Sequence, residues 1–143
     1  MAEETQLTID IQHGKRVLFV DDERVITDTL VTIFSQSGYE AKGVYSAEQA
    51  LALLEDWHPE LVVIDVLLPA MNGIDLAIRI KSEWPQCHIS LFSGQAATAD
   101  LLESATKSGH TFGVLAKPVH PSELLEIAGR LLGEQPISLQ KGG

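Results

Sequence analysis

The chain has few cysteines, few basic residues and no long apolar run, and each shortage argues against a class of protein. Its one cysteine, Cys87, cannot form an internal disulfide, which fits a reducing cytoplasm. Cys87 opens an apolar run, so we interpret it as a partly buried apolar residue rather than a nucleophile. Only 10 Lys and Arg residues oppose 20 Asp and Glu residues, giving a net charge of −10. This charge disfavours direct binding to nucleic acids and to anionic membranes.

The pattern of hydrophobic residues predicts one cytoplasmic domain without a membrane anchor. No segment approaches the roughly 20 apolar residues of a membrane helix. Residues 1–5 are acidic and polar, unlike a secretory signal. A chain of 143 residues with 45% hydrophobic content is large enough for one domain with its own core. We expect this domain over residues 15–133, between flexible tails over residues 1–14 and 134–143.

Within this domain, strand-like apolar runs alternate with amphipathic segments of helical period. We expect strands near residues 16–20, 40–44, 61–65, 88–92 and 111–116, and helices near 25–37, 46–56, 74–84, 98–108 and 121–132. In the last helix, Leu124, Ile127, Ala128 and Leu131 are expected to face the core. The alternation indicates an α/β domain with a parallel sheet covered on both faces. Right-handed crossovers and a cleft where the first and third strands diverge favour the doubly wound, flavodoxin-like order 2-1-3-4-5, an order that also rests in part on the family resemblance described below.

Carboxylates stand at the ends of two of these apolar runs. Asp65 closes the run over residues 61–64, and Asp21 and Asp22 follow the run over residues 17–20. Because open parallel sheets bind ligands at the carboxyl ends of their strands, we expect the three carboxylates to lie together. Mg²⁺ prefers such oxygen ligands, and the backbone carbonyl of Leu67 is a further candidate. Taken alone, Asp21 and Asp22 also fit a simple helix start, where acids favour the helix dipole.

Two further strands bring a hydroxyl and an ammonium group to the same edge. Ser93 follows an apolar run, and Gly94 after it allows close backbone approach. Lys117, before Pro118, follows the last predicted strand. The hydroxyl can bond a phosphoryl oxygen, and the ammonium can neutralise carboxylates or bind an oxyanion. Taken alone, Ser93 followed by Gly94 is only a turn signal, and Lys117 also fits an ordinary solvated lysine. The bond before Pro118 can be cis, which sequence does not decide.

Together, these motifs and the segment over residues 65–73 resemble the response-regulator receiver domain of two-component signal transduction, from about residue 16 to residue 132. The resemblance implies a phosphorelay protein whose Asp65 accepts a phosphoryl group from a histidine kinase or a histidine phosphotransfer protein. It also implies that Lys117 pairs with Asp65 and then with the phosphoryl group, while Ser93 bonds a phosphoryl oxygen. Mg²⁺ is the implied cofactor, and the implied role is a signalling switch rather than a turnover enzyme.

The chain departs from the family pattern at Val114, and two further positions bear on hydrolysis. Val114 stands three residues before the lysine, where receivers usually carry Tyr or Phe, and Phe112 lies on the same side of the strand. Either Phe112 substitutes for this ring in an altered way or the aromatic switch is absent, and we expect absent or weakened coupling between phosphorylation and the surface. Leu67 and Gln95, two residues past Asp65 and Ser93, flank the path of the hydrolytic water. The bulk of Leu67 predicts slow self-dephosphorylation.

The resemblance also suggests how the protein makes contacts. The usual contact face of receivers corresponds here to residues 97–108, 111–116 and 121–132, with Leu102 as an exposed candidate contact. A homodimer stays open, and the sequence names neither kinase nor target. One alternative is a degenerate receiver that acts as a constitutive interaction module, which Val114 favours. Another alternative is a metal-dependent phosphatase of the aspartyl-phosphate type, but such an enzyme would require a general-acid Asp at the position of Leu67.

Overall fold

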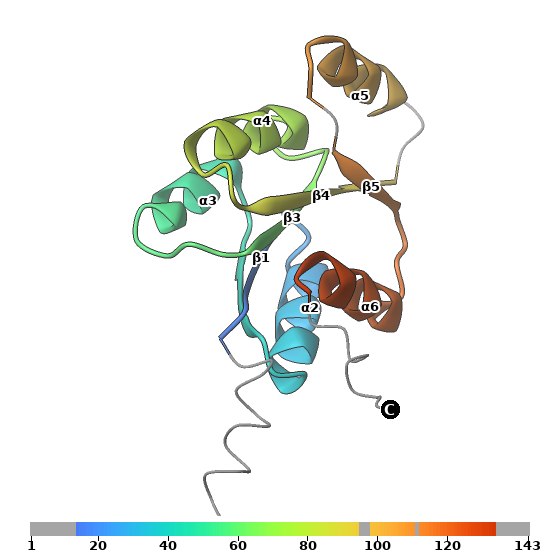
Figure 1. The fold of residues 1–143 in the computed structure, drawn as a ribbon. Coiled ribbons are helices and arrows are strands. Elements are labelled where there is room, and N and C mark those ends of the chain that lie inside the picture. The colour runs from blue at the N-terminus through green and yellow to red at the C-terminus, as the bar shows by residue number, and fades with distance from the viewer. Residues whose placement is uncertain (1–13, 95–97, 111, 134–143) are drawn as a thin grey trace, which may run out of the picture.

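The computed structural model describes residues 14–94, 98–110 and 112–133 of the chain (Figure 1). Both predicted tails, apart from Gly14, and the positions of Gln95 and Thr111 lie outside the described residues. The predicted division into one domain and two flexible tails therefore stays a prediction.

Five strands form one parallel sheet in the order β2-β1-β3-β4-β5, which confirms the predicted topology. The strands are β1 (Arg16–Val20), β2 (Glu40–Val44), β3 (Leu61–Asp65), β4 (His88–Ser93) and β5 (Gly113–Ala116). The central strand β3 is buried along its whole length. Apolar residues occupy consecutive positions of this strand, rather than alternate ones, because helices cover both faces of a parallel sheet and neither side of the strand meets water.

The helices form two layers, one on each face of the sheet. They are α2 (Arg24–Gln36), α3 (Ala47–Leu54), α4 (Gly73–Glu83), α5 (Thr98–Lys107) and α6 (Pro121–Leu131). Figure 1 shows α2 and α6 on one face and α3, α4 and α5 on the other. Alternation along β1 places Leu18 in the buried cluster under α3 and α4, and Phe19 in the cluster under α2 and α6. The site edge is therefore built on a rigid, two-sided core.

Two expectations about surface residues are wrong. Leu131, predicted to face the core, is 37% exposed because it lies in the last turn of α6, whereas Leu124 and Ala128 are buried as predicted. Leu102, predicted to be an exposed contact, is partly buried and packs against the cluster under α3 and α4. In the amphipathic helix α5 this leucine packs towards the core, so only part of its surface is accessible to a partner.

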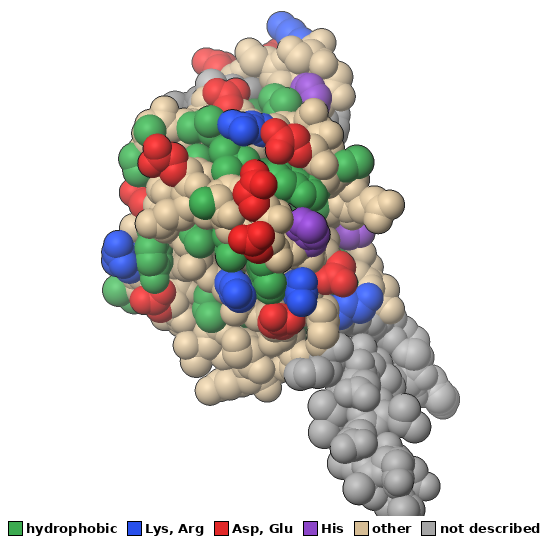
Figure 2. Space-filling view, turned by 90° about the vertical axis from the view of Figure 1, so that its left-hand side faces the viewer, with side chains coloured by type: hydrophobic (Ala, Val, Ile, Leu, Met, Phe, Trp, Pro, Cys, Tyr) green, Lys and Arg blue, Asp and Glu red, His purple; other side chains and the backbone are tan. Residues whose placement is uncertain are grey.

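The surface opposite the strand ends is not dominated by one charge. Figure 2 faces the left-hand side of Figure 1, where β4 begins, and shows hydrophobic, acidic and basic side chains interspersed. Here Arg16 pairs with Glu40 at 3.0 Å, so part of the acid excess is neutralised. Within the described ranges, no helix is long and apolar enough to cross a membrane.

Candidate functional site

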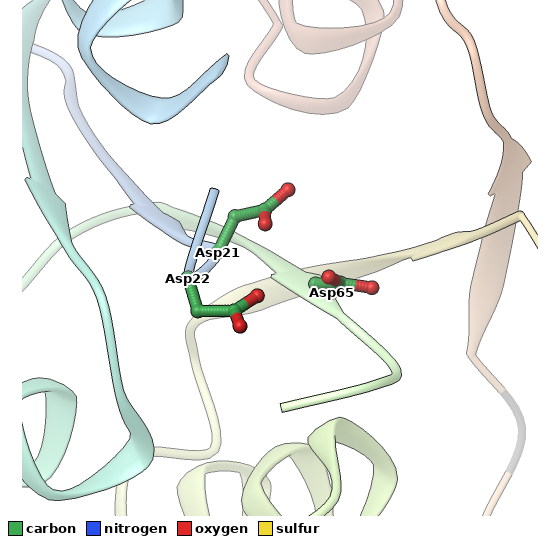
Figure 3. A group of neighbouring side chains, drawn as sticks. All are labelled: Asp21, Asp22 and Asp65. Atoms are coloured by element: carbon green, nitrogen blue, oxygen red, sulfur yellow. The ribbon is translucent and has the colours of Figure 1, made fainter. Parts of the chain in front are cut away.

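Three carboxylates meet at the carboxyl edge of the sheet, as predicted. Asp21 and Asp22 follow β1 and Asp65 ends β3, and these two strands are paired neighbours. One oxygen from each side chain lies within 4.8 Å of the others. Figure 3 shows the three side chains directed to the same side of the strand ends. Asp21 and Asp65 are buried while Asp22 is exposed, so the cluster is open to solvent on one side.

Local hydrogen bonds fix Asp21 in this place. Its backbone N–H donates to the carbonyl of Val44 at 3.2 Å, and its side chain accepts from the backbone N–H of Glu23 at 3.0 Å. The hydroxyl of Thr27, which is completely buried in α2, donates to the Asp21 carbonyl at 2.8 Å. The first turns of α2 therefore hold a buried carboxylate at a defined position, which lowers the entropy that a ligand must remove.

The loop after β3 holds Asp65 through its backbone. The N–H of Leu67 donates to Oδ1 of Asp65 at 3.2 Å. The loop closes at the start of α4, where the N–H of Gly73 donates to the carbonyl of Val66 at 2.7 Å. A Cβ atom at Gly73 would collide with the backbone carbonyl of Asp65. Only glycine permits this close approach, so the start of α4 and the position of Asp65 depend on each other.

Lys117 reaches the carboxylates from the end of β5. Its Nζ lies 2.9 Å from Oδ2 of Asp21, 3.2 Å from Oε1 of Glu23 and 3.3 Å from Oδ2 of Asp65. The family resemblance implied the contact with Asp65, whereas the sequence analysis did not single out Glu23 as a partner of the lysine. The available signal was the third acid directly after the aspartate pair. The bond between Lys117 and Pro118 is cis, which the sequence allowed but did not decide.

Burial and charge set the protonation behaviour of this cluster. Burial, followed by the negative charge of Asp21, raises the pKa of Asp65 to about 6, against the opposing effects of the Leu67 N–H and of Lys117. Burial lowers the pKa of Lys117, but hydrogen bonds and charges from Asp21, Asp65 and Glu23 outweigh this and raise it. Crowded carboxylates whose ionisation is penalised are the donor set that a divalent cation stabilises. These residues therefore fit Mg²⁺.

The other predicted site residues occupy the same edge or lie near it. Ser93 ends β4, is half-buried and is paired with Ala116, and its carbonyl accepts from the Lys117 backbone N–H at 3.1 Å. Val114 is 45% exposed on β5. Phe112 instead packs against the cluster under α3 and α4 and stacks on His110, with ring centroids 6.4 Å apart. The ring of Phe112 therefore lies against the core, while the Val114 position presents a small aliphatic side chain.

The fold and the site define a class: a doubly wound α/β domain with an acidic cluster and a lysine at the carboxyl edge of its sheet. The chain belongs to the response regulator receiver domain family, which matches residues 17–128. Members of this family accept phosphoryl groups and interact with histidine kinases or phosphotransfer proteins. The resemblance seen in the sequence is thus confirmed.

Individual relatives support the same assignment. The chain is 30% identical over 119 residues to the chemotaxis protein CheY of Thermotoga maritima, covering 82% of this chain and 98% of that protein. It is 32% identical over 138 residues to the phosphate regulon transcriptional regulatory protein PhoB of Pseudomonas aeruginosa, covering 91% of this chain but only 59% of PhoB. The crystal structure of a CheY-like receiver domain protein from Methanospirillum hungatei has a TM-score of 0.75 at 29% identity, covering 87% of this chain and 98% of that one.

Proposed function

We propose that this chain is a Mg²⁺-dependent receiver that accepts a phosphoryl group on Asp65 in a cytoplasmic phosphorelay. One observation carries the proposal: the Lys117 ammonium contacts Asp65 and Asp21 at 3.3 and 2.9 Å, at the same place where three carboxylates converge. A nucleophilic carboxylate beside a fixed cation is the arrangement that phosphoryl transfer requires, because the transferred group carries negative charge on its oxygens.

In the proposed reaction, a carboxylate oxygen of Asp65 attacks phosphorus in line with the leaving group. The new O–P bond forms as the P–N bond of a phosphohistidine or the P–O bond of an acyl phosphate breaks. The leaving imidazole takes a proton from solvent, and a leaving carboxylate needs none. With a pKa of about 6, Asp65 is mostly ionised at neutral pH and can act as the nucleophile.

The remaining residues of the edge orient and neutralise the phosphoryl group. Lys117 donates to one of its oxygens, and the Ser93 hydroxyl donates to another. Asp21, Asp22 and Asp65, with the carbonyl of Leu67, would hold Mg²⁺, which supplies further neutralisation of charge on the phosphoryl oxygens. Self-phosphorylation and slow self-dephosphorylation are the only chemistry that we propose.

A phosphodonor protein must approach the open side of this edge, and an apolar groove lies there. Val25, at 80% exposure, and Ile26 line a cavity of about 280 Å³ together with Lys117, Pro118 and Val119. We propose that the donor contacts this groove, because it is continuous with the lysine of the site. Val25→Ser should slow transfer from a phosphorylated histidine phosphotransfer protein without slowing phosphorylation by acetyl phosphate. Equal slowing with both donors would contradict this docking role.

The test of the main proposal is phosphorylation of the intact chain. Incubation with acetyl phosphate and Mg²⁺ should add the mass of one phosphoryl group, mapped to Asp65 after reduction with borohydride. Asp65→Asn should not gain this mass, and removal of Mg²⁺ with EDTA should abolish it. Gain of the same mass by Asp65→Asn would refute Asp65 as the acceptor.

A second candidate function is a receiver that binds phosphoryl groups without transmitting a signal, or an interaction module without a switch. The aliphatic Val114 favours it. Amide NMR with Mg²⁺, before and after addition of beryllofluoride, separates the cases. Shifts that spread over α5, β5 and α6, the proposed target-binding face, indicate a working switch. Shifts confined to the neighbours of Asp65, Ser93 and Lys117 indicate binding without transmission. No shift at all indicates an interaction module without a phospho-switch.

A further inference from the structure

The donor capacity of Lys117 is fully used by three carboxylates. An ammonium group has three N–H donors and accepts no hydrogen bond. Asp21, Glu23 and Asp65 lie 2.9, 3.2 and 3.3 Å from Nζ, so each can accept one donor. A phosphoryl oxygen that enters the site can therefore bind the ammonium only after one of these carboxylates has released it.

The three carboxylates differ in what their release costs. The side chains of Asp21 and Asp65 are 2% and 9% exposed, whereas that of Glu23 is 60% exposed. A buried carboxylate that loses its cation stays uncompensated in a poorly hydrated place, which is strongly unfavourable. An exposed carboxylate exchanges the ammonium for water at little cost. Glu23 is therefore the partner that gives way most easily.

We propose that Glu23 is a positioning residue that occupies one donor of Lys117 before phosphorylation and yields that donor to the phosphoryl group. The inference rests on the proposed phosphorylation of Asp65. Glu23 follows β1 directly before α2 and meets the lysine from β5, so it positions the ammonium toward the open side of the cluster. In this role it competes with the phosphoryl oxygens, and its loss should favour phosphoryl binding.

The test compares Glu23→Gln with the wild type in the presence of Mg²⁺. We expect about two- to five-fold tighter binding of beryllofluoride and a similar increase in the rate of phosphorylation by acetyl phosphate, the range set by an exposed ion pair. The matched control is Glu48→Gln, which removes the same charge from the exposed first turn of α3, just after the carboxyl end of β2. The control should behave like the wild type. Equal gains in both variants would overturn the proposal.

Two further measurements separate the proposed competition from other roles. Glu23→Asp keeps the negative charge but shortens the side chain by one methylene group, which moves the carboxylate away from Lys117. If Glu23 competes for the lysine donor, Glu23→Asp should therefore bind beryllofluoride as tightly as Glu23→Gln does. Behaviour like the wild type would show a simple charge effect and overturn the proposal. Titration with Mg²⁺ alone should give affinities for Glu23→Gln and wild type within about two-fold, as for an exposed charge. A larger loss would identify Glu23 as a metal ligand instead.

Failure of this inference is distinguishable from failure of the proposed function. If the wild type is phosphorylated on Asp65 and Glu23→Gln binds beryllofluoride no more tightly, only the role of Glu23 is refuted. If the wild type is not phosphorylated on Asp65, the proposed function itself fails.

Discussion

Replacing the proposed phospho-acceptor by its neutral isostere should stabilise the fold. The pKa of Asp65 is raised from 3.8 to about 6, chiefly by burial. Because the folded state disfavours the ionised carboxyl group, the wild type loses stability as the pH rises from the unfolded pKa to the folded pKa, and the full cost is present above the folded pKa. A shift of about two units corresponds to about 3 kcal/mol in the free energy of unfolding. Asp65→Asn lacks this charge and should therefore unfold at higher urea concentration than the wild type at pH 7.

The pH dependence gives the sharper form of this prediction. The folded carboxyl group binds its proton more tightly than the unfolded one, so this term destabilises the wild type as the pH rises from 3.8 to about 6. The advantage of Asp65→Asn should be largest at pH 7 and should shrink as the pH falls towards 4. Saturating Mg²⁺ should also shrink it, because the cation binds only the folded wild-type cluster.

The assay is urea unfolding followed by circular dichroism between pH 4 and 7.5, in EDTA and then in Mg²⁺. Asp56→Asn is the control, since it removes an exposed aspartate after α3 and should change stability by less than about 0.5 kcal/mol. A stability difference between Asp65→Asn and wild type that does not vary with pH would refute the reasoning. So would a less stable Asp65→Asn at pH 7.

Three further predictions follow from close packing and exposure. Gly73→Ala should lower stability by at least about 2 kcal/mol, because its Cβ would collide with the backbone carbonyl of Asp65. In the same urea assay Gly129→Ala, in open space on α6, should be neutral or stabilising, and equal losses would contradict the collision. Leu67→Asn should shorten the lifetime of the phosphoryl group on Asp65 several-fold, because it removes an apolar side chain beside the path of the hydrolytic water. The lifetime is measured as the loss of the added mass over time, and an unchanged or longer lifetime would refute this prediction. Burial raises the pKa of the Cys87 thiol to about 12. At pH 8, Cys87 of the folded protein should therefore react with a thiol reagent at least about a hundred-fold more slowly than Cys87 of the protein unfolded in urea, and equal rates would refute its burial.

The sequence predicted the parallel sheet and the edge at which the site lies because both depend on local patterns, while the order of the strands came in part from the family resemblance. Apolar runs alternating with amphipathic segments indicate parallel strands and covering helices. In such a sheet all carboxyl ends share one edge, so polar residues that end different runs must meet. This is why Asp21, Asp65 and Lys117 could be grouped although 96 residues separate the first from the last.

What the sequence could not provide depends on distances between elements that are remote along the chain. Glu23 and Lys117 are 94 residues apart, and only the tertiary fold brings Lys117, after the end of β5, to Glu23, before the start of α2. The inward face of Leu102 likewise depends on how α5 is rotated against the sheet. The raised pKa of Asp65 depends on burial by its neighbours, which no local pattern encodes. The sequence by itself determined which groups come to the edge of the sheet, while the tertiary structure alone decided which of them touch and how strongly water is excluded between them.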